Sequence, residues 1–266
     1  MARKYITYMH IGLQDALVYR ANAIIWMLVD SLPAYTMLLI WSAVYQGGQS
    51  IAGYTLGDMA AYYLAATFIG VAIEAHPEYS LSYEIRHGLL SHQLVRPWSY
   101  FWASIVGETS WQVVKSAMGL PLLALIAWVF RSIVSWPQLR GGQWAVFLLS
   151  VVLAFAINIG AKMALGSLAF WLAEPMGILN IYDSLSWLLQ GGVVPIDLFP
   201  RWLQIVGDAL PFKYSLAFPV MILQNRLPAQ ALIPGLLWQA FWALCMMGTA
   251  LGVWRRGVRA YAAVGG

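Results

Sequence analysis

The sequence predicts an all-α integral membrane protein with six transmembrane helices. Of its 266 residues, 61% are hydrophobic and only 10% are charged, whereas soluble domains have about 25% charged residues. The mean hydropathy is +0.68. Apolar residues form long continuous runs instead of the alternating pattern of strands in a membrane barrel. The 14 tryptophans also suit the aromatic belts found at both membrane surfaces.

The first 20 residues predict an amphipathic helix that lies in the membrane interface. Tyr5, Tyr8, Gly12 and Ala16 recur at helical spacing, and charged residues fall between them. This stretch has neither the uninterrupted apolar core nor the small-residue cleavage site of a secretory signal peptide. We therefore expect residues 1–20 to form an elbow helix that precedes the first span.

Six ranges are predicted to cross the membrane, although the second is short for a span of about 20 residues. They are 21–45, 58–73, 103–130, 143–168, 175–193 and 232–254. The turn between the fourth and fifth falls at 159–162 or at 173–175. We favour the second position because Pro175 disfavours helix at Glu174, which is charged. No linker or internal repeat divides the chain, so residues 1–266 are expected to form one membrane domain.

Basic residues predict the orientation, because cytoplasmic segments carry an excess of Lys and Arg. With the N-terminus inside, the cytoplasmic segments hold Arg3, Lys4, Arg20, Arg86, Arg96, Arg255, Arg256 and Arg259. The outer segments hold the smaller set Arg131, Arg140, Arg201, Lys213 and Arg226. This bias favours both termini in the cytoplasm. The net charge of +4 then reflects contact with lipid headgroups and not with nucleic acid.

A polar segment, residues 74–102, connects the second and third spans on the predicted cytoplasmic side. Leu81, Ile85 and Leu89 step at about one helical turn, so much of the segment should be helical. Gly88 permits a bend, and Pro97 ends the helix. A short helix held at the membrane surface could transmit force from a soluble partner. The alternative is an ordinary interfacial loop helix.

Residues 191–231 form the longest predicted outer segment, and glycines and prolines interrupt it. The pieces between the prolines are amphipathic, as in RWLQIVGDAL, and too short to span a bilayer. Irregular backbone at membrane depth requires cover by protein or a wet cavity. We expect re-entrant helices that cap one end of a pathway, with a loop lying on the membrane surface as the alternative.

Ionisable residues within predicted spans are costly, so each is a candidate functional residue. They are Asp30, Glu108, Lys115, Lys162, Glu174 and Asp183. Glu108 and Lys115 share a helix face two turns apart, slightly too far for a direct pair, so either could have its partner on another helix. Lys162 and Asp183 form the favoured buried pair if the fourth and fifth spans pack together. For Glu108 and Glu174 we favour an interfacial position.

Several chemistries find no support in the sequence. The single cysteine, Cys245, allows no internal disulfide or cysteine-based metal site, and His87 and His92 are spaced poorly for one helix face. No Ser-His-Asp arrangement is recognisable. None of the four lysines occurs in a G-x-x-x-x-G-K-[ST] phosphate-binding loop. We therefore expect no catalytic, cofactor-binding or metal-binding residue in this chain, and no enzymatic activity.

Taken together, these features resemble the permease subunit of a type-2 ABC exporter, in the branch known only as an uncharacterised permease component. The resemblance rests on the elbow helix, six spans, a coupling helix between spans two and three and a glycine–proline outer segment. It also rests on the phrases GLLSHQLVRP, LAFWL, GGVVPIDLFPRWL, LPFKYSLAFP and WRRGVRAYAAVGG, in this order along nearly the whole chain. Gln190 departs from the serine usual before GGVVP.

The resemblance implies a multi-pass protein of the inner (plasma) membrane with several partners. Two separate ATPase subunits would bind ATP and Mg²⁺, and a second permease, identical or a sister protein, would complete the pathway. Coupling to the ATPases would involve residues 80–97, in particular Glu84, Ile85, Arg86, Gly88, Leu89, Leu94, Arg96 and Pro97. The outer gate would comprise Gly191, Gly192, Pro195, Phe199, Pro200, Pro211 and Phe212.

Two other functions remain open at this stage. A secondary transporter or channel would favour helices broken near the membrane midplane and inverted repeats, neither of which we detect. A membrane scaffold or assembly protein would have no transport role. The sequence does not identify a substrate, although apolar spans with aromatic ends suit a lipid, a glycolipid or a hydrophobic drug.

Overall fold

A computed structural model of the chain is all-helical in the part that it describes, residues 2–45, 50–129, 131, 132, 134, 139 and 141–261. The expected end of the third span at Phe130, Arg140 and the last five residues lie outside the described residues. The longer helices are α1 (Ala2–Val18), α2 (Arg20–Val44), α3 (Leu56–Ile73), α6 (Tyr100–Val129), α7 (Gly141–Gly166), α8 (Met176–Leu189) and α12 (Ala229–Ala260). Short helices are α4 (Pro77–Arg86), α5 (Leu90–Leu94), α9 (Arg201–Ala209), α10 (Pro211–Ser215), α11 (Ala217–Leu223) and the 3-10 turns η1 (Ser167–Phe170) and η2 (Ile196–Leu198).

Four described segments are long and apolar enough to cross a membrane. They are Arg20–Val44, Leu56–Arg86, Gly141–Phe170 and Ala229–Ala260. The expected third span corresponds to α6, a 30-residue helix that carries Glu108 and Lys115. The expected fifth span corresponds to α8, whose 14 residues extend about 21 Å, less than the roughly 30 Å of a bilayer core. The helix break before α8 falls at residues 171–175, the second of the two positions considered above.

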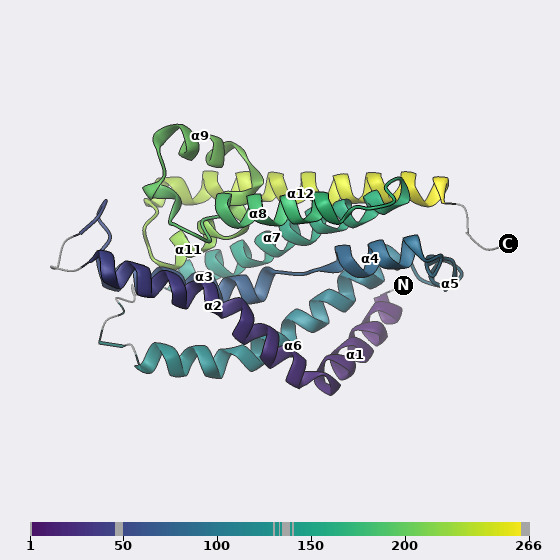
Figure 1. Ribbon diagram of the computed structural model, residues 1–266, viewed down its shortest axis with the longest axis horizontal. Coiled ribbons are helices and arrows are strands. Elements are labelled where there is room, and N and C mark those ends of the chain that lie inside the picture. The colour runs from purple at the N-terminus through teal and green to yellow at the C-terminus, as the bar shows by residue number, and fades with distance from the viewer. Residues whose placement is uncertain are drawn as a thin grey trace.

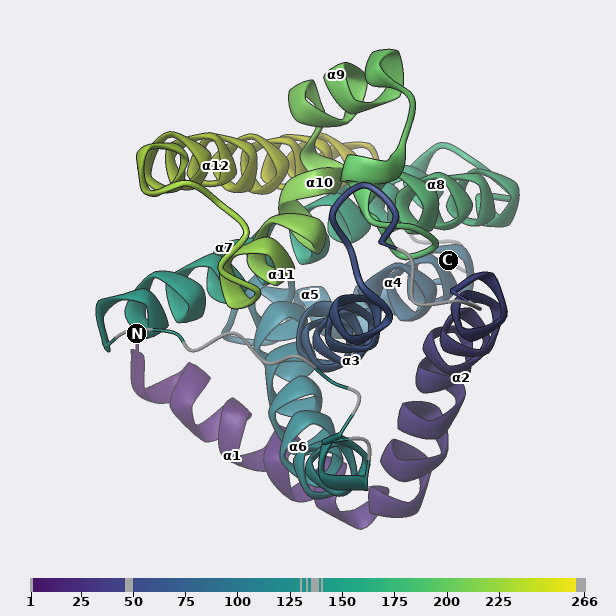
Figure 2. The same ribbon diagram turned by 90° about the vertical axis from the view of Figure 1, so that its left-hand side faces the viewer.

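The central helix of the bundle is α3, with α2, α6, α7 and α11 around it (Figure 2). Twelve of its 18 residues are buried, which explains its nearly uniform apolar composition. Thr55 and Asp58 form a capping box at its start. The elbow helix α1 runs beside α6, where Gly12 lies close to Ser110.

The start of α1, the short helix α5 and the end of α12 lie toward the same end of the bundle (Figure 1). Three contacts connect these parts of the chain. Lys4 Nζ donates to the Pro97 carbonyl at 2.9 Å, the Ser99 amide donates to the Tyr5 hydroxyl at 3.4 Å, and the hydroxyls of Ser91 and Tyr261 are 3.2 Å apart. Both ends of the chain are thus attached to the segment 74–102.

The backbones of helices α7 and α12 approach each other closely at Gly160. A Cβ atom at this position would lie 2.9 Å from the backbone of Met246 and Met247. We expect Gly160→Ala to lower the free energy of unfolding by about 1–3 kcal/mol, because the two backbones would have to separate. Gly248→Ala on α12, where nothing lies within 4 Å, is the matched control and should be neutral or slightly stabilising. Unfolding in detergent would compare the stability of the two variants. Equal unfolding midpoints would show that the α7 and α12 backbones are not in close contact at Gly160.

Candidate functional site

The segment 74–102 folds into two helices that turn at Gly88, where φ is +75°. Leu81, Ile85 and Leu90 are at most 5% exposed and join a core with Phe101, Met163 and Trp254. The apolar face of α4 and α5 is thus fixed against α7 and α12. Ile85, expected among the residues that couple to a partner, is buried and contacts only this chain's own core.

The other face of this segment is exposed at the end of the bundle. Leu89, Leu94 and Val95 are 43%, 38% and 83% exposed, and they are neighbours in sequence of Arg86 and Arg96. Arg86 forms an ion pair with Glu174 at 3.2 Å, which joins the end of α4 to the turn before α8. Arg96 stacks over the Trp98 ring at 5.5 Å. The surface therefore combines apolar side chains with two guanidinium groups.

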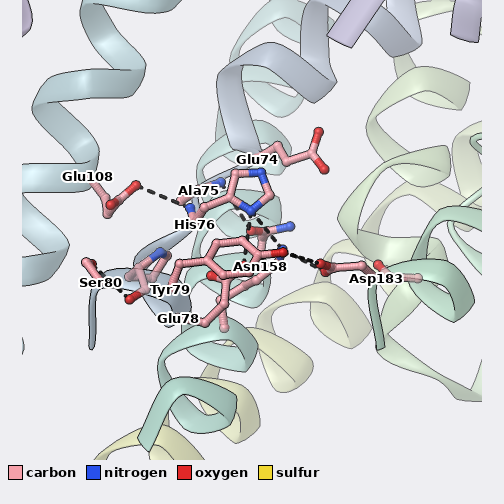
Figure 3. A network of polar contacts seen from close by, with 12 residues as sticks. Glu74, Ala75, His76, Glu78, Tyr79, Ser80, Glu108, Asn158 and Asp183 are labelled. Atoms are coloured by element: carbon pink, nitrogen blue, oxygen red, sulfur yellow. Dashed lines mark hydrogen bonds and ion pairs between the residues drawn. The ribbon is translucent and has the colours of Figure 1, made fainter. Parts of the chain in front are cut away.

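A buried charge network lies at the start of α4 (Figure 3). Lys162 Nζ on α7 lies 2.8 Å from Asp183 Oδ1 on α8 and 3.0 Å from Glu78 Oε1 on α4. The pairing of Lys162 with Asp183, favoured from the sequence, is therefore observed. The network extends to His76, whose Nδ1 lies 3.1 Å from both Lys162 Nζ and Glu78 Oε1.

Two members of this network, Lys162 and Glu78, are buried and a third, Asp183, is partly exposed. Lys162 is 3% exposed and Glu78 is 1% exposed, whereas the Asp183 side chain retains 32% exposure. Tyr79 donates a hydrogen bond to the second Asp183 oxygen at 3.3 Å. Three helices, α4, α7 and α8, thus meet through one ammonium group.

Three other charges predicted within the spans, Asp30, Glu108 and Lys115, line a cavity that borders the Lys162 network at His76 and Tyr79. Lys115 on α6 pairs with Asp30 on α2 at 2.5 Å, so each finds its partner on another helix and not in Glu108. Glu108 accepts a hydrogen bond from the His76 backbone amide at 3.3 Å. All three line a cavity of about 730 Å³, and a second cavity of about 290 Å³ shares Asp30 and Glu74 with it.

The segment 191–231 is attached to α3 through tyrosine hydroxyls. Tyr62 donates to the Gly191 carbonyl and Tyr63 to the Val193 carbonyl, both at 2.7 Å. Trp41 Nε1 donates to the Tyr63 hydroxyl at 2.7 Å. Gly191 has φ +88° and directs its carbonyl at Tyr62. Of the other gate residues predicted here, Pro195 and Pro211 are buried, and Phe212 packs against Tyr182 with 5.7 Å between ring centroids.

A second set of contacts holds the same segment to the loop before α3. Tyr54 donates to Asp197 at 3.0 Å, and Arg226 stacks over the Tyr54 ring at 3.6 Å while pairing with Asp58 at 3.3 Å. Burial and the nearby Asp197 carboxylate raise the pKa of the Tyr54 phenol above its ordinary value, so this hydroxyl remains a donor at neutral pH. The segment is therefore fixed at both of its ends.

Sequence reasoning missed three residues of these sites, Glu74, His76 and Glu78. They belong to the polar stretch EAHPEYSLSYEIR, and the available signal was Pro77, which favours a helix start and places Glu78 in its first turn. No group of three or more histidine, cysteine or carboxylate side chains converges as a metal site among the described residues.

Comparison with known proteins identifies a family. The sequence matches the family described as ABC-2 family transporter protein over residues 32–265. A search of curated proteins found no match to the sequence.

Proposed function

Because the chain belongs to the ABC-2 transporter family, we propose that it is the permease subunit of an ATP-driven exporter. In this proposal ATP is hydrolysed on two separate ATPase subunits, which hold ATP and Mg²⁺. Two permeases, identical or sister proteins, enclose the substrate pathway in the plasma (inner) membrane. The chain itself catalyses no reaction.

The exposed face of α4 and α5 carries this proposal. Exposed apolar side chains beside two arginines suit a protein partner, because apolar anchors and arginine are enriched at the centre of protein interfaces. This face lies at the bundle end that also holds the start of α1 and the end of α12 (Figure 1). We place that end in the cytoplasm, where the ATPases are.

The charge network provides the path by which ATPase closure would reach the spans. A force on α5 passes to α4 across the turn at Gly88, and α4 is bonded to α7 and α8 through Glu78, Lys162 and Asp183. Helix α8 leads directly to Gly191, where the outer gate begins. Tilting of α8 would therefore reposition the gate.

The proposal assigns six membrane crossings to the chain. Four are the long apolar segments described above, and the other two are α6 and α8. Because α8 is short, it crosses the membrane together with the residues that follow it, up to Val193. These residues are not helical, and the hydroxyls of Tyr62 and Tyr63 on α3 donate hydrogen bonds to their carbonyls. The segment 191–231 then lies on the outer side, as re-entrant helices.

Charge reversal on the exposed face tests the proposal. We expect Arg86→Glu and Arg96→Glu each to reduce recovery of ATPase subunits with an affinity-tagged permease at least about tenfold, as for loss of a charged interface contact. Vanadate-sensitive ATP hydrolysis by the purified complex should fall in parallel.

Arg201→Glu is the control, because Arg201 is an exposed arginine on α9, outside the segment 74–102. It should leave recovery unchanged. If both Arg86→Glu and Arg96→Glu recover as much ATPase as the wild type does, this face is not the coupling surface. A wild-type chain that purifies alone and conducts ions would contradict the proposed function altogether.

A further inference from the structure

The two adjoining cavities contain a carboxylate that the fold does not neutralise. Asp30 is paired with Lys115, and Glu108 accepts the His76 amide. The Glu74 carboxylate has neither a hydrogen bond nor an ion pair among the described residues. Figure 3 shows it directed away from the charge network around Lys162. Glu74 lines both cavities and so lies where they meet.

Hydrogen bonds fix the backbone at Glu74 beside the two cavities. Its amide donates to the Gly70 carbonyl at 2.9 Å, and its carbonyl accepts from Gln112 Nε2 at 2.5 Å. Gln112 also lines the larger cavity, is only 5% exposed, and its Oε1 atom has no partner. A carboxylate and an amide oxygen that both lack partners line this cavity, so the site favours a ligand that brings positive charge or a hydrogen-bond donor.

Aromatic rings form much of the remaining wall of the larger cavity. Trp26, Tyr79 and Trp111 contribute from α2, α4 and α6, and Tyr19 contributes from the turn between α1 and α2. Faces of aromatic rings attract cations, and organic cations are bound by such rings together with a carboxylate. The volume of about 730 Å³ is in the range of sites for drug-sized molecules.

We propose that these cavities bind an amphiphilic organic cation, with Glu74 as the charge partner and the aromatic rings around its apolar body. This inference rests on the proposed function, for which it names the substrate class. Asp30 and Lys115 neutralise each other in the wall. Glu74 and Glu108 are the wall carboxylates that have no ion pair among the described residues, so the larger cavity presents negative charge to a cationic ligand.

Binding of tetraphenylphosphonium to the full-length chain in lipid nanodiscs tests the site directly. Equilibrium dialysis of the labelled cation, corrected for empty nanodiscs, should show saturable binding to wild-type protein. We expect Glu74→Gln to weaken binding about tenfold to a hundredfold, as for loss of one charge-assisted contact. Glu74→Asp, which keeps the charge, should bind within a few-fold of wild type.

Two controls separate the effect of charge at this position from other causes. Asp15→Asn removes one exposed carboxylate on the elbow helix and should bind like wild type. Tetraphenylborate, an anion of nearly the same size, should show no saturable binding when it is dialysed by itself against the same nanodiscs. The unfolding midpoint of Glu74→Gln should equal or exceed that of wild type, since the substitution removes a half-buried charge that has no ion pair and breaks no hydrogen bond of the side chain.

Three results would overturn the site. They are wild-type affinity in Glu74→Gln, saturable binding of tetraphenylborate alone as tight as that of the cation, and loss of binding in both Glu74 variants with a lowered unfolding midpoint. The assay contains no ATPase subunit. A failed cation site therefore leaves the coupling experiment intact, and a chain that binds the cation without recruiting an ATPase contradicts only the proposed function.

Discussion

Lys162→Met should be the most destabilising single substitution among the charges of the bundle, lowering the free energy of unfolding by about 3–5 kcal/mol. Methionine retains the length of the lysine stem and removes the ammonium group. Glu78, which is 1% exposed, would then lose its ammonium partner and keep only the His76 ring at 3.1 Å, while Asp183 could still reach water through its exposed edge. Unfolding by denaturing detergent, followed by tryptophan fluorescence, measures the loss.

A second substitution should recover much of that loss. In Lys162→Met with Glu78→Leu, no buried charge is stranded, and apolar replacement of both members of a buried pair is often neutral. The double variant should therefore be more stable than Lys162→Met alone. It should still transport poorly, because α4 would no longer be bonded to α7 and α8 through a charged group.

The matched control is Lys213→Met, which removes the partner of Asp208 on α9. The Asp208 side chain is 52% exposed and can be hydrated, so we expect a loss of at most about 1 kcal/mol. Similar losses for Lys162→Met and Lys213→Met would show that burial does not set the strength of the Lys162 network. Additive effects of the Lys162 and Glu78 substitutions would show that the two residues do not interact.

The sequence was sufficient to predict the long helices, because each is a long, mostly apolar run with few charges inside it and a polar or proline boundary. The predicted ranges 21–45 and 143–168 differ from α2 and α7 by only one or two residues at each end. It did not predict how short α8 is. Apolar residues continue beyond the end of α8 as far as Val194, so hydropathy does not mark where the helix ends. The end of α8 depends on the positive φ of Gly191 and on the contact of Gly191 with α3.

The charge sites show the same division between local and tertiary information. The partners Lys162 and Asp183 were predicted because both lie in apolar surroundings on consecutive spans. Glu78 was missed because it belongs to a polar stretch that looks solvated in sequence, and only the packing of α4 on α7 buries it. The free carboxylate of Glu74 also has no sequence signature, since the absence of a partner is a property of the assembled helices.

Gly191→Ala should have the largest effect on the proposed outer gate. The residue has φ +88°, which costs a residue with a side chain about 1–2 kcal/mol. A Cβ atom there would lie 2.5 Å from the Tyr62 hydroxyl, so that hydroxyl must move and its hydrogen bond to the Gly191 carbonyl is lost. A buried hydroxyl without a partner costs about 1–3 kcal/mol more. We expect a total loss of about 2–5 kcal/mol in the free energy of unfolding.

Gly177→Ala on α8 is the control, since it is helical and nothing lies within 4 Å of its added methyl group. It should be neutral or stabilising by up to about 1 kcal/mol. Two causes contribute to the loss in Gly191→Ala, the positive φ and the lost Tyr62 hydrogen bond. Tyr62→Phe removes only the hydrogen bond, so it should lower the free energy of unfolding by less than Gly191→Ala does. If Gly191→Ala is as stable as Gly177→Ala, the backbone there does not hold the gate against α3. If Gly191→Ala is destabilising in the wild-type background but not in the Tyr62→Phe background, the clash with the Tyr62 hydroxyl, and not the positive φ, is the cause.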